Sequence, residues 1–200
     1  MPCYAFEGIR PVVHPTSFVH PTASLIGDVI VGPGCYIGAG ASLRGDFGRI
    51  VVEGDSSVQD NCTLHTGSGS DCVIGRGATI GHGSIVHGAT IGENALVGMN
   101  AVVLDEAVIG AESLIGALSL VKSDMRAARR SLIAGNPAKV IREMPAEAIV
   151  WKNDGDGEYQ RLARQSVADF EECAPLAEAE PDRRRVSGEA RAVRLKLGSN

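Results

Sequence analysis

Residues 91–121 read IGENALVGMNAVVLDEAVIGAESLIGALSLV, and every sixth residue of this stretch is aliphatic. The recurring residues are Ile91, Val97, Val103, Ile109, Ile115 and Val121. An amphipathic helix would repeat its apolar residues every three or four positions, and a two-faced strand would repeat them every second position. A step of six therefore indicates short strands joined by turns, each strand supplying one inward aliphatic side chain.

The same step of six continues toward the N-terminus. The further inward positions are Val31, Ile37, Leu43, Val52, Val58, Leu64, Ile74, Ile80 and Val86. Three hexads close one triangular coil of about eighteen residues, and stacked coils bury a continuous aliphatic column that no single coil could bury. Glycines and small residues near the corners let the chain bend sharply. The sequence thus predicts an all-β solenoid.

Three steps in the repeat are irregular. The step is nine residues from Leu43 to Val52, ten from Leu64 to Ile74 and five from Val86 to Ile91. We expect extra residues to loop out at the first two and a tightened corner at the third. Long loops on a regular scaffold often carry function, so both insertions are candidate functional segments.

Composition narrows the classes of partner. The 200 residues are 44% hydrophobic and 22% charged, with a formal net charge of -5, which predicts a folded chain that does not bind nucleic acid. The sequence has no apolar run long enough to span a membrane and no signal-peptide layout at its start, so we expect a cytoplasmic protein without a membrane partner. Cys35, Cys62 and Cys72 occupy small-residue positions of the hexads and are expected to be buried reduced thiols.

Histidines stand at informative positions. His65 and His87 each directly follow an inward aliphatic residue, and they lie one coil apart once the four extra residues of the intervening loop are removed. His82 stands two residues after an inward position on the preceding face, so it points to a different edge of the same chain. The three imidazoles can meet only if a neighbouring subunit brings its own His82 edge. The spacing therefore predicts a homotrimer with sites between subunits.

Several motifs resemble a known family. They are Arg44-Gly45-Asp46-Phe47-Gly48, Val58-Gln59-Asp60-Asn61, Leu64-His65, Ile80-Gly81-His82-Gly83 and Val86-His87-Gly88. With the hexad repeat, these motifs resemble the hexapeptide-repeat, γ-class carbonic anhydrase-like family over about residues 8–172. The segments near Tyr4, Phe18, Trp151 and Tyr159 resemble a branch associated with phenylacetate degradation and the carnitine operon. The resemblance implies a left-handed parallel β-helix, the hexapeptide-repeat solenoid, with C-terminal α-helices, assembled as a homotrimer.

The resemblance also implies a metal site. In this family a trio corresponding to His65, His82 and His87 binds a divalent ion, usually Zn²⁺, with Fe²⁺ or Co²⁺ as alternatives, and leaves a position open for water. The alternative reading is that the three histidines merely fill solenoid corners.

Four further residues accompany the trio in the family. Arg44 and Asp46 form an ion pair at the trimer contact, Gln59 lies near the metal-bound water, and Asp60 belongs to a supporting hydrogen-bond network. For Arg44 and Asp46, a purely structural interface ion pair is an equal alternative to a catalytic contribution.

An open three-histidine zinc site lowers the pKa of bound water toward 7 and polarises a carbonyl, so it can hydrate carbon dioxide or hydrolyse a thioester. Fast carbon dioxide hydration needs a proton shuttle, and the loop of residues 66–71 holds a single acid, Asp71. We therefore predict a metal-dependent acyl-coenzyme A thioesterase of phenylacetate and aromatic-acid catabolism, which hydrolyses stalled ring-derived thioesters with zinc-bound hydroxide.

Other functions remain open. They are a γ-class carbonic anhydrase, a hexapeptide-repeat acyltransferase that uses a histidine as general base, and a non-catalytic accessory protein of the carnitine pathway. Fold alone does not choose among them.

The chain divides into four predicted parts. Residues 1–22 are a lead-in segment, 23–135 the left-handed β-helix, 136–180 helices that pack along the solenoid, and 181–200 a basic, flexible tail. Pro145 is expected to open the first helix. The arginines of the tail are either a solvated segment or an attraction for the phosphates of coenzyme A.

Overall fold

The computed structural model describes residues 3–151 and 157–186. Its strands are β1 (Cys3–Tyr4), β2 (Val12–Val13), β3 (Phe18–Val19), β4 (Ser24–Val31), β5 (Tyr36–Ile37), β6 (Ser42–Val52), β7 (Ser57–Val58), β8 (Thr63–His65), β9 (Cys72–Ile74), β10 (Thr79–Ile80), β11 (Ile85–His87), β12 (Thr90–Ile91), β13 (Leu96–Val97), β14 (Val102–Val103), β15 (Val108–Ile109), β16 (Leu114–Ile115), β17 (Leu120–Val121), β18 (Arg126–Ala127), β19 (Ser131–Gly135) and β20 (Ala138–Glu143). A 3-10 helix, η1 (Ala146–Ala148), and an α-helix, α1 (Glu158–Asp169), follow.

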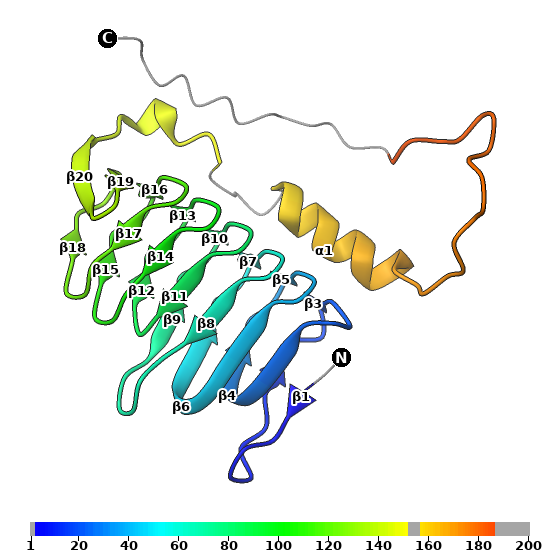
Figure 1. Ribbon diagram of the computed structural model, residues 1–200, viewed down its shortest axis with the longest axis horizontal. Helices are drawn as coiled ribbons and strands as arrows, with labels where there is room; N and C mark the ends of the chain where they lie inside the picture. Colours follow the sequence, from blue (N-terminus) through cyan, green and yellow to red (C-terminus); the bar gives the residue numbers. More distant parts are fainter. Residues whose placement is uncertain (1–2, 152–156, 187–200) are drawn as a thin grey trace.

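The strands stack in parallel, coil upon coil (Figure 1). One sheet runs in the order β17-β14-β11-β8-β6-β9-β12-β15-β18, and the other runs β20-β19-β16-β13-β10-β7-β5-β3. Ile91 of β12, for example, lies in register between Ile74 of β9 and Ile109 of β15. The predicted solenoid is confirmed, because residues one coil apart in sequence are neighbours in space.

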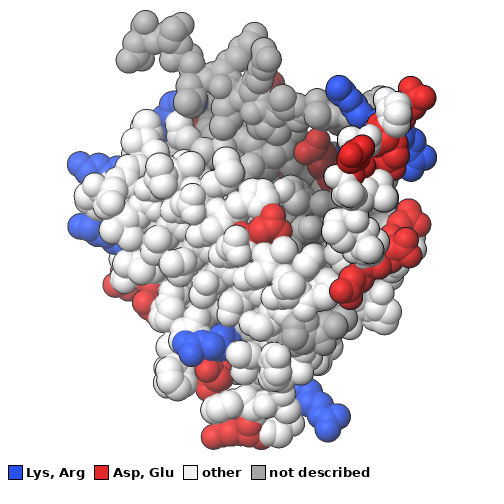
Figure 2. Space-filling view, turned by 45° about the vertical axis from the view of Figure 1, so that its right-hand side comes forward, with Lys and Arg blue, Asp and Glu red and all other residues white. Residues whose placement is uncertain are grey.

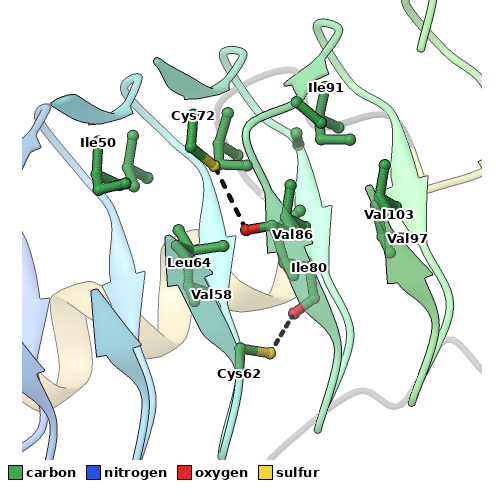
Figure 3. Close-up of a cluster of buried hydrophobic side chains, with 14 of the residues drawn as sticks. Ile50, Val58, Cys62, Leu64, Cys72, Ile80, Val86, Ile91, Val97 and Val103 are labelled. Carbon is green, nitrogen blue, oxygen red and sulfur yellow. Dashed lines mark hydrogen bonds between the residues drawn. The ribbon is translucent and has the colours of Figure 1, made fainter. Parts of the chain in front are cut away.

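The inward positions form one aliphatic column (Figure 3). All of the inward aliphatic residues named above are at most 1% exposed. Cys35, Cys62 and Cys72 are buried free thiols within this column, as predicted. The Cys62 thiol donates to the carbonyl oxygen of Gly81 at 3.1 Å, so the cysteines are small packing residues with weak hydrogen bonds.

Burial makes these three thiols hard to ionise. Desolvation raises the pKa of Cys35 and Cys62 to about 11 and that of Cys72 to about 12. In the unfolded chain these thiols ionise near their ordinary pKa, whereas in the folded protein they stay protonated. The free energy of unfolding therefore falls as pH rises above about 9.

The thiolate is the reactive form, so we expect iodoacetamide at pH 8.5 to label Cys3 and Cys173, both exposed, in the folded protein. All five cysteines should react in 8 M urea. Peptide mass spectrometry of the alkylated chain checks this, and rapid labelling of Cys72 under native conditions would contradict the buried placement.

The bends at the corners of the coils are not made mainly by glycines, as the sequence analysis expected. A residue in the left-handed region recurs every six positions from Asn94 to Arg130, with φ between 53° and 63°. These non-glycine residues make the bends, and the glycines that stand two positions before four of them, Gly92, Gly98, Gly110 and Gly116, do not. Gly92 has a different role, because a Cβ there would lie 2.5 Å from the backbone nitrogen of Ala111 in the next coil. Such glycines allow one coil to approach the next closely.

The irregular steps are also resolved. The nine-residue step does not loop out as expected: its residues extend β6 into an eleven-residue strand that pairs with β4 across a register shift. The ten-residue step does form a loop, residues 66–71, between β8 and β9. A side chain at Gly48 would collide with the carbonyl oxygen of Ser70, so the two insertions pack against each other. The five-residue step turns at Gly88, where φ is 55°.

Both ends of the solenoid depart from the predicted boundaries. The lead-in segment already contributes strands, since β3 pairs with β5 and Phe18 and Val19 are buried, so coils begin before residue 23. Residues 136–180 are not helices alone, because β20 pairs antiparallel with β19. The open edge of β19 explains this strand, since its backbone groups need partners.

The C-terminal segment packs along the solenoid as predicted. Helix α1 contacts β3 and β5, and the indole Nε1 of Trp151 donates to the carbonyl oxygen of Asn94 at 2.9 Å. Residues 152–156 lie outside the described residues, and so does the predicted basic tail from residue 187 onward. No helix in the described ranges is long and apolar enough to cross a membrane.

On the face shown in Figure 2, uncharged residues, drawn in white, cover most of the surface of the described residues, and the charged residues lie mainly toward its margins. Among the described residues visible there, Lys and Arg do not form a continuous basic area.

Candidate metal centre

The site is built on the ends of two neighbouring strands. His65 is the last residue of β8 and His87 the last of β11, and the two are register partners in adjacent coils. The inward residues before them, Leu64 and Val86, are fully buried and thereby fix the edge on which both imidazoles lie. Nδ1 of His65 and Nε2 of His87 are 3.1 Å apart, so the two histidines stack on one edge as predicted.

Carboxylates hold the outer nitrogens of both rings. Nδ1 of His87 bonds Oδ1 of Asp105 at 2.6 Å, and Nε2 of His65 bonds Oδ1 of Asp46 at 3.1 Å. Arg44 completes this group, with its guanidinium 3.5 Å from Asp46 and 3.0 Å from Nε2 of His65. His65 is only 9% exposed, whereas the side chains of Arg44 and Asp105 are 45% and 46% exposed, so the group is buried at His65 and open to solvent at its rim.

The carboxylate of Asp105 only accepts, so it sets the tautomer of a neutral His87 and leaves Nε2 of that ring with a lone pair. At Nε2 of His65, Asp46 accepts and Arg44 donates, so either tautomer of His65 finds a partner. If each outer nitrogen donates its hydrogen to a carboxylate, Nδ1 of His65 and Nε2 of His87 both carry lone pairs, and they face each other at 3.1 Å. Two facing lone pairs repel unless a metal ion lies between them, whereas the other tautomer of His65, with its Nε2 accepting from Arg44, donates from Nδ1 to Nε2 of His87. A metal ion with bonds of about 2.0–2.1 Å to imidazole nitrogens accommodates such a separation, and carboxylate-held histidines are the usual ligands of that kind.

The remaining candidates form a second group on another edge. Nδ1 of His82 is 3.1 Å from Oδ2 of Asp60, and the backbone N–H of His82 donates to Oε1 of Gln59 at 3.2 Å. The His82 side chain is 45% exposed. Within one chain, the described residues hold no group of three or more His, Cys, Asp and Glu side chains placed to bind a metal ion. The seven predicted residues therefore form two separate groups on different edges of the chain.

Sequence reasoning missed two neighbours of the histidine pair. Asp105 lies one coil after His87, and an acid eighteen residues after a candidate ligand is the signal that could have found it. Phe47 lies beside His65, with ring centroids 5.7 Å apart, although its side chain is 60% exposed.

Comparison with known proteins identifies the family to which this solenoid belongs. Residues 10–45 and 88–123 match the model of the bacterial transferase hexapeptide (six repeats), and residues 69–105 match the hexapeptide repeat of succinyl-transferase. The carnitine operon protein CaiE of Escherichia coli O81 (strain ED1a) is 49% identical over 188 residues, which cover 94% of this chain and 96% of the relative. The chain belongs to the hexapeptide-repeat family. CaiE of Escherichia coli O1:K1 / APEC matches with the same identity and coverage.

Two solved hexapeptide-repeat structures agree with this assignment. A hexapeptide transferase family protein from Anaplasma phagocytophilum is 38% identical with a TM-score of 0.73, covering 84% of this chain and 95% of its own. A Bacillus cereus protein provisionally named an acetyltransferase is 33% identical with a TM-score of 0.74, covering 82% and 92%. The left-handed parallel β-helix expected from the family is confirmed.

Proposed function

We propose that this hexapeptide-repeat protein is a metal-dependent hydrolase of coenzyme A thioesters that works as a homotrimer. One observation carries the proposal: the inner nitrogens of His65 and His87 face each other at 3.1 Å while Asp46 and Asp105 hold the outer ones. This pair supplies two of the three ligands that an open catalytic zinc site requires.

His82 of a second subunit would supply the third ligand. When bound, Zn²⁺ lowers the pKa of its water toward 7 and acts as a Lewis acid toward a carbonyl. The chain's own residues do the rest: Asp105 fixes the tautomer of His87, Asp46 accepts a hydrogen bond from Nε2 of His65 in the metal-binding tautomer, Asp60 orients His82, and Gln59 holds the His82 backbone. Fe²⁺ and Co²⁺ suit the same imidazole ligands.

The two edges of the prism favour self-association. On the His82 edge, the apolar side chains of Met99 and Leu118 are 54% and 72% exposed and follow in the next two coils. Phe47 is exposed beside His65 on the other edge. If the His82 edge of each copy contacts the His65/His87 edge of the next, three triangular prisms close into a ring. This contact would cover the exposed apolar side chains of both edges.

Coenzyme A thioesters fit the family. The provisional acetyltransferase name of the Bacillus cereus relative points to an acyl-bearing substrate. In the proposed reaction, water adds to the thioester carbonyl, the carbon–sulfur bond breaks, and the coenzyme A thiol leaves with a proton. The resemblance to phenylacetate-associated proteins favours ring-derived acyl groups, whereas the carnitine operon protein name of the relatives favours carnitine-related ones.

Acyl transfer is the second candidate, and the match to the bacterial transferase hexapeptide favours it. In that reaction a histidine acts as general base and the acyl group passes to an amine or hydroxyl. It needs an acceptor but no metal.

Free coenzyme A release distinguishes the two. We expect zinc-loaded protein to release coenzyme A from phenylacetyl-coenzyme A or a related thioester without any acceptor, and removal of the metal by a chelator to abolish the release. Release that requires an acceptor and survives chelation would favour acyl transfer. Zinc-dependent carbon dioxide hydration without thioester cleavage would favour a γ-class carbonic anhydrase.

Asp105 should matter for metal affinity. The Asp105→Asn variant keeps the size of the side chain but loses the carboxylate that bonds His87, so we expect the zinc dissociation constant to rise about 10- to 100-fold. Competition with a fluorescent zinc chelator measures it. Asp124→Asn, in the same corner one coil further on, is the matched control and should leave the constant unchanged.

A further inference from the structure

Strand β6 bulges outward beside the histidine pair. Before the bulge Gly27 of β4 pairs with Gly45, and after it Val29 pairs with Ile50. Residues 46–49 of β6 therefore stand opposite a single residue of β4. Bulges are common next to active sites, where they change the direction in which a side chain points. The extra residues of the nine-residue step thus give this edge side chains that a regular coil would not present.

The bulge is held on two sides. Nε of Arg49 donates to Oδ2 of Asp28 at 3.0 Å, which ties the bulge to β4. A Cβ on Gly48 would collide with the carbonyl oxygen of Ser70, so the loop of residues 66–71 packs directly against the bulge. Side chains on a backbone held in this way are positioned before a ligand arrives, which reduces the entropy lost on binding.

Two consecutive residues of the bulge contact His65. Oδ1 of Asp46 bonds Nε2 of the imidazole at 3.1 Å. The Phe47 ring lies 5.7 Å from the imidazole, centroid to centroid, at an interplanar angle of 51°. Phe47 is nevertheless 60% exposed, so much of its ring surface is open to contact with another molecule. An aromatic ring fixed in this position is suited to contact a substrate bound at the histidine pair.

We propose that Phe47 binds the ring of the acyl group and thereby selects ring-bearing thioesters for hydrolysis. The inference rests on the proposed function, because it assigns an acyl class to that same site. Aromatic rings in edge-to-face or offset contact attract one another beyond the apolar area that they bury. In a phenylacetyl thioester one methylene separates the ring from the carbonyl, so a ring bound at Phe47 keeps its carbonyl close to the histidine pair.

The other side chains that bond the pair do not suit a ring. Asp46 and Asp105 are carboxylates, and contact with an apolar ligand would remove water from them without providing a hydrogen bond. The guanidinium of Arg44 already contacts Asp46 and His65. An aromatic face also attracts a quaternary ammonium group, but Arg44 and the proposed metal ion would repel a cationic acyl group and not a neutral ring.

Acyl selectivity tests the assignment. For zinc-loaded Phe47→Ala we expect kcat/KM for phenylacetyl-coenzyme A to fall about tenfold, the loss expected for one aromatic contact. The value for acetyl-coenzyme A should stay unchanged. Phe170→Ala truncates a phenylalanine that contacts Phe18 and His20 instead of the histidine pair, and should change neither value.

Three kinetic outcomes overturn the assignment. They are no fall for phenylacetyl-coenzyme A, an equal fall for both substrates, and a larger fall for carnitinyl-coenzyme A, whose acyl group carries a cation instead of a ring. Native mass spectrometry and zinc analysis detect a purely structural role. Because Phe47 is largely exposed, we expect Phe47→Ala to keep the trimer and its zinc content, and loss of either would mean that Phe47 serves the subunit contact instead.

Direct binding separates this inference from the proposed function. The probes are phenylethyl-coenzyme A and ethyl-coenzyme A, two thioethers that cannot be hydrolysed, and calorimetry on the wild type and Phe47→Ala measures their dissociation constants. Binding that weakens about tenfold for the ring-bearing probe alone supports the role of Phe47 even if the protein hydrolyses no thioester. Hydrolysis by the wild type together with unchanged binding of both probes by Phe47→Ala overturns this role and leaves the hydrolase intact.

Discussion

Replacing His87 with alanine is expected to remove the bound metal and to lower the rate of thioester hydrolysis at least about a thousandfold, which corresponds to the several kcal/mol that a metal contributes. The variant leaves Nδ1 of His65 without its partner at 3.1 Å and leaves Asp105 without its imidazole. Elemental analysis of the purified protein and the coenzyme A release assay measure the two effects.

His20→Ala is the control for this variant. His20 bonds Thr22 in a turn near the N-terminus, so its loss should change neither metal content nor rate. If His87→Ala retains both its metal and its rate, the proposed metal centre is wrong.

Mixing two inactive variants tests whether the site lies between subunits. His87→Ala lacks one edge of the site and His82→Ala lacks the other, so each variant keeps the half that its counterpart has lost. If the two are unfolded together and refolded as a random 1:1 mixture, about a quarter of the interfaces combine two intact halves. We expect a similar fraction of wild-type activity. Absence of any recovery, with mixed trimers shown by native mass spectrometry, would contradict an intersubunit site.

The second large effect is on stability. Ile91 is fully buried between Ile74 and Ile109 of the adjacent coils. When its side chain is truncated, no neighbouring side chain is free to fill the space that it leaves. We expect Ile91→Ala to lower the free energy of unfolding by about 3–4 kcal/mol, the usual cost of a cavity in a packed column. Urea unfolding followed by circular dichroism at one fixed protein concentration measures it.

Thr90→Ala, one residue earlier on the same strand, provides the comparison. Thr90 is exposed and faces outward, so its truncation should cost no more than about 1 kcal/mol. Equal losses for the two variants would mean that the inward column is not the main source of stability.

The sequence was most informative where a single rule governs many residues. The inward aliphatic positions predict the coils because each must be buried, and the same arithmetic places His65 beside His87. The outcome of the nine-residue step could not be predicted in this way. Its extra residues extend β6 because β4 offers a long edge to pair with, and the paired residues of β4 lie eighteen to twenty-one positions away in sequence.

Asp105 and β20 were missed for a similar reason. Acids are common at the corners, and only the register of the coils shows that Asp105 reaches Nδ1 of His87. The sequence of β20 has no inward step of six, and it becomes a strand because the last coil leaves the edge of β19 open. Tertiary partners, rather than local pattern, determine both features.

The reversed direction of β20 limits the length of the molecule. In a parallel stack every coil presents the next with an edge like its own, so a stack can in principle lengthen by adding copies, as fibrils do. At β19 the hydrogen-bonding groups of that edge are already used by a strand of opposite polarity, from Ser131 paired with Glu143 to Gly135 paired with Ala138. The column is thereby terminated on this sheet, and copies of the chain are left to meet side by side rather than end to end.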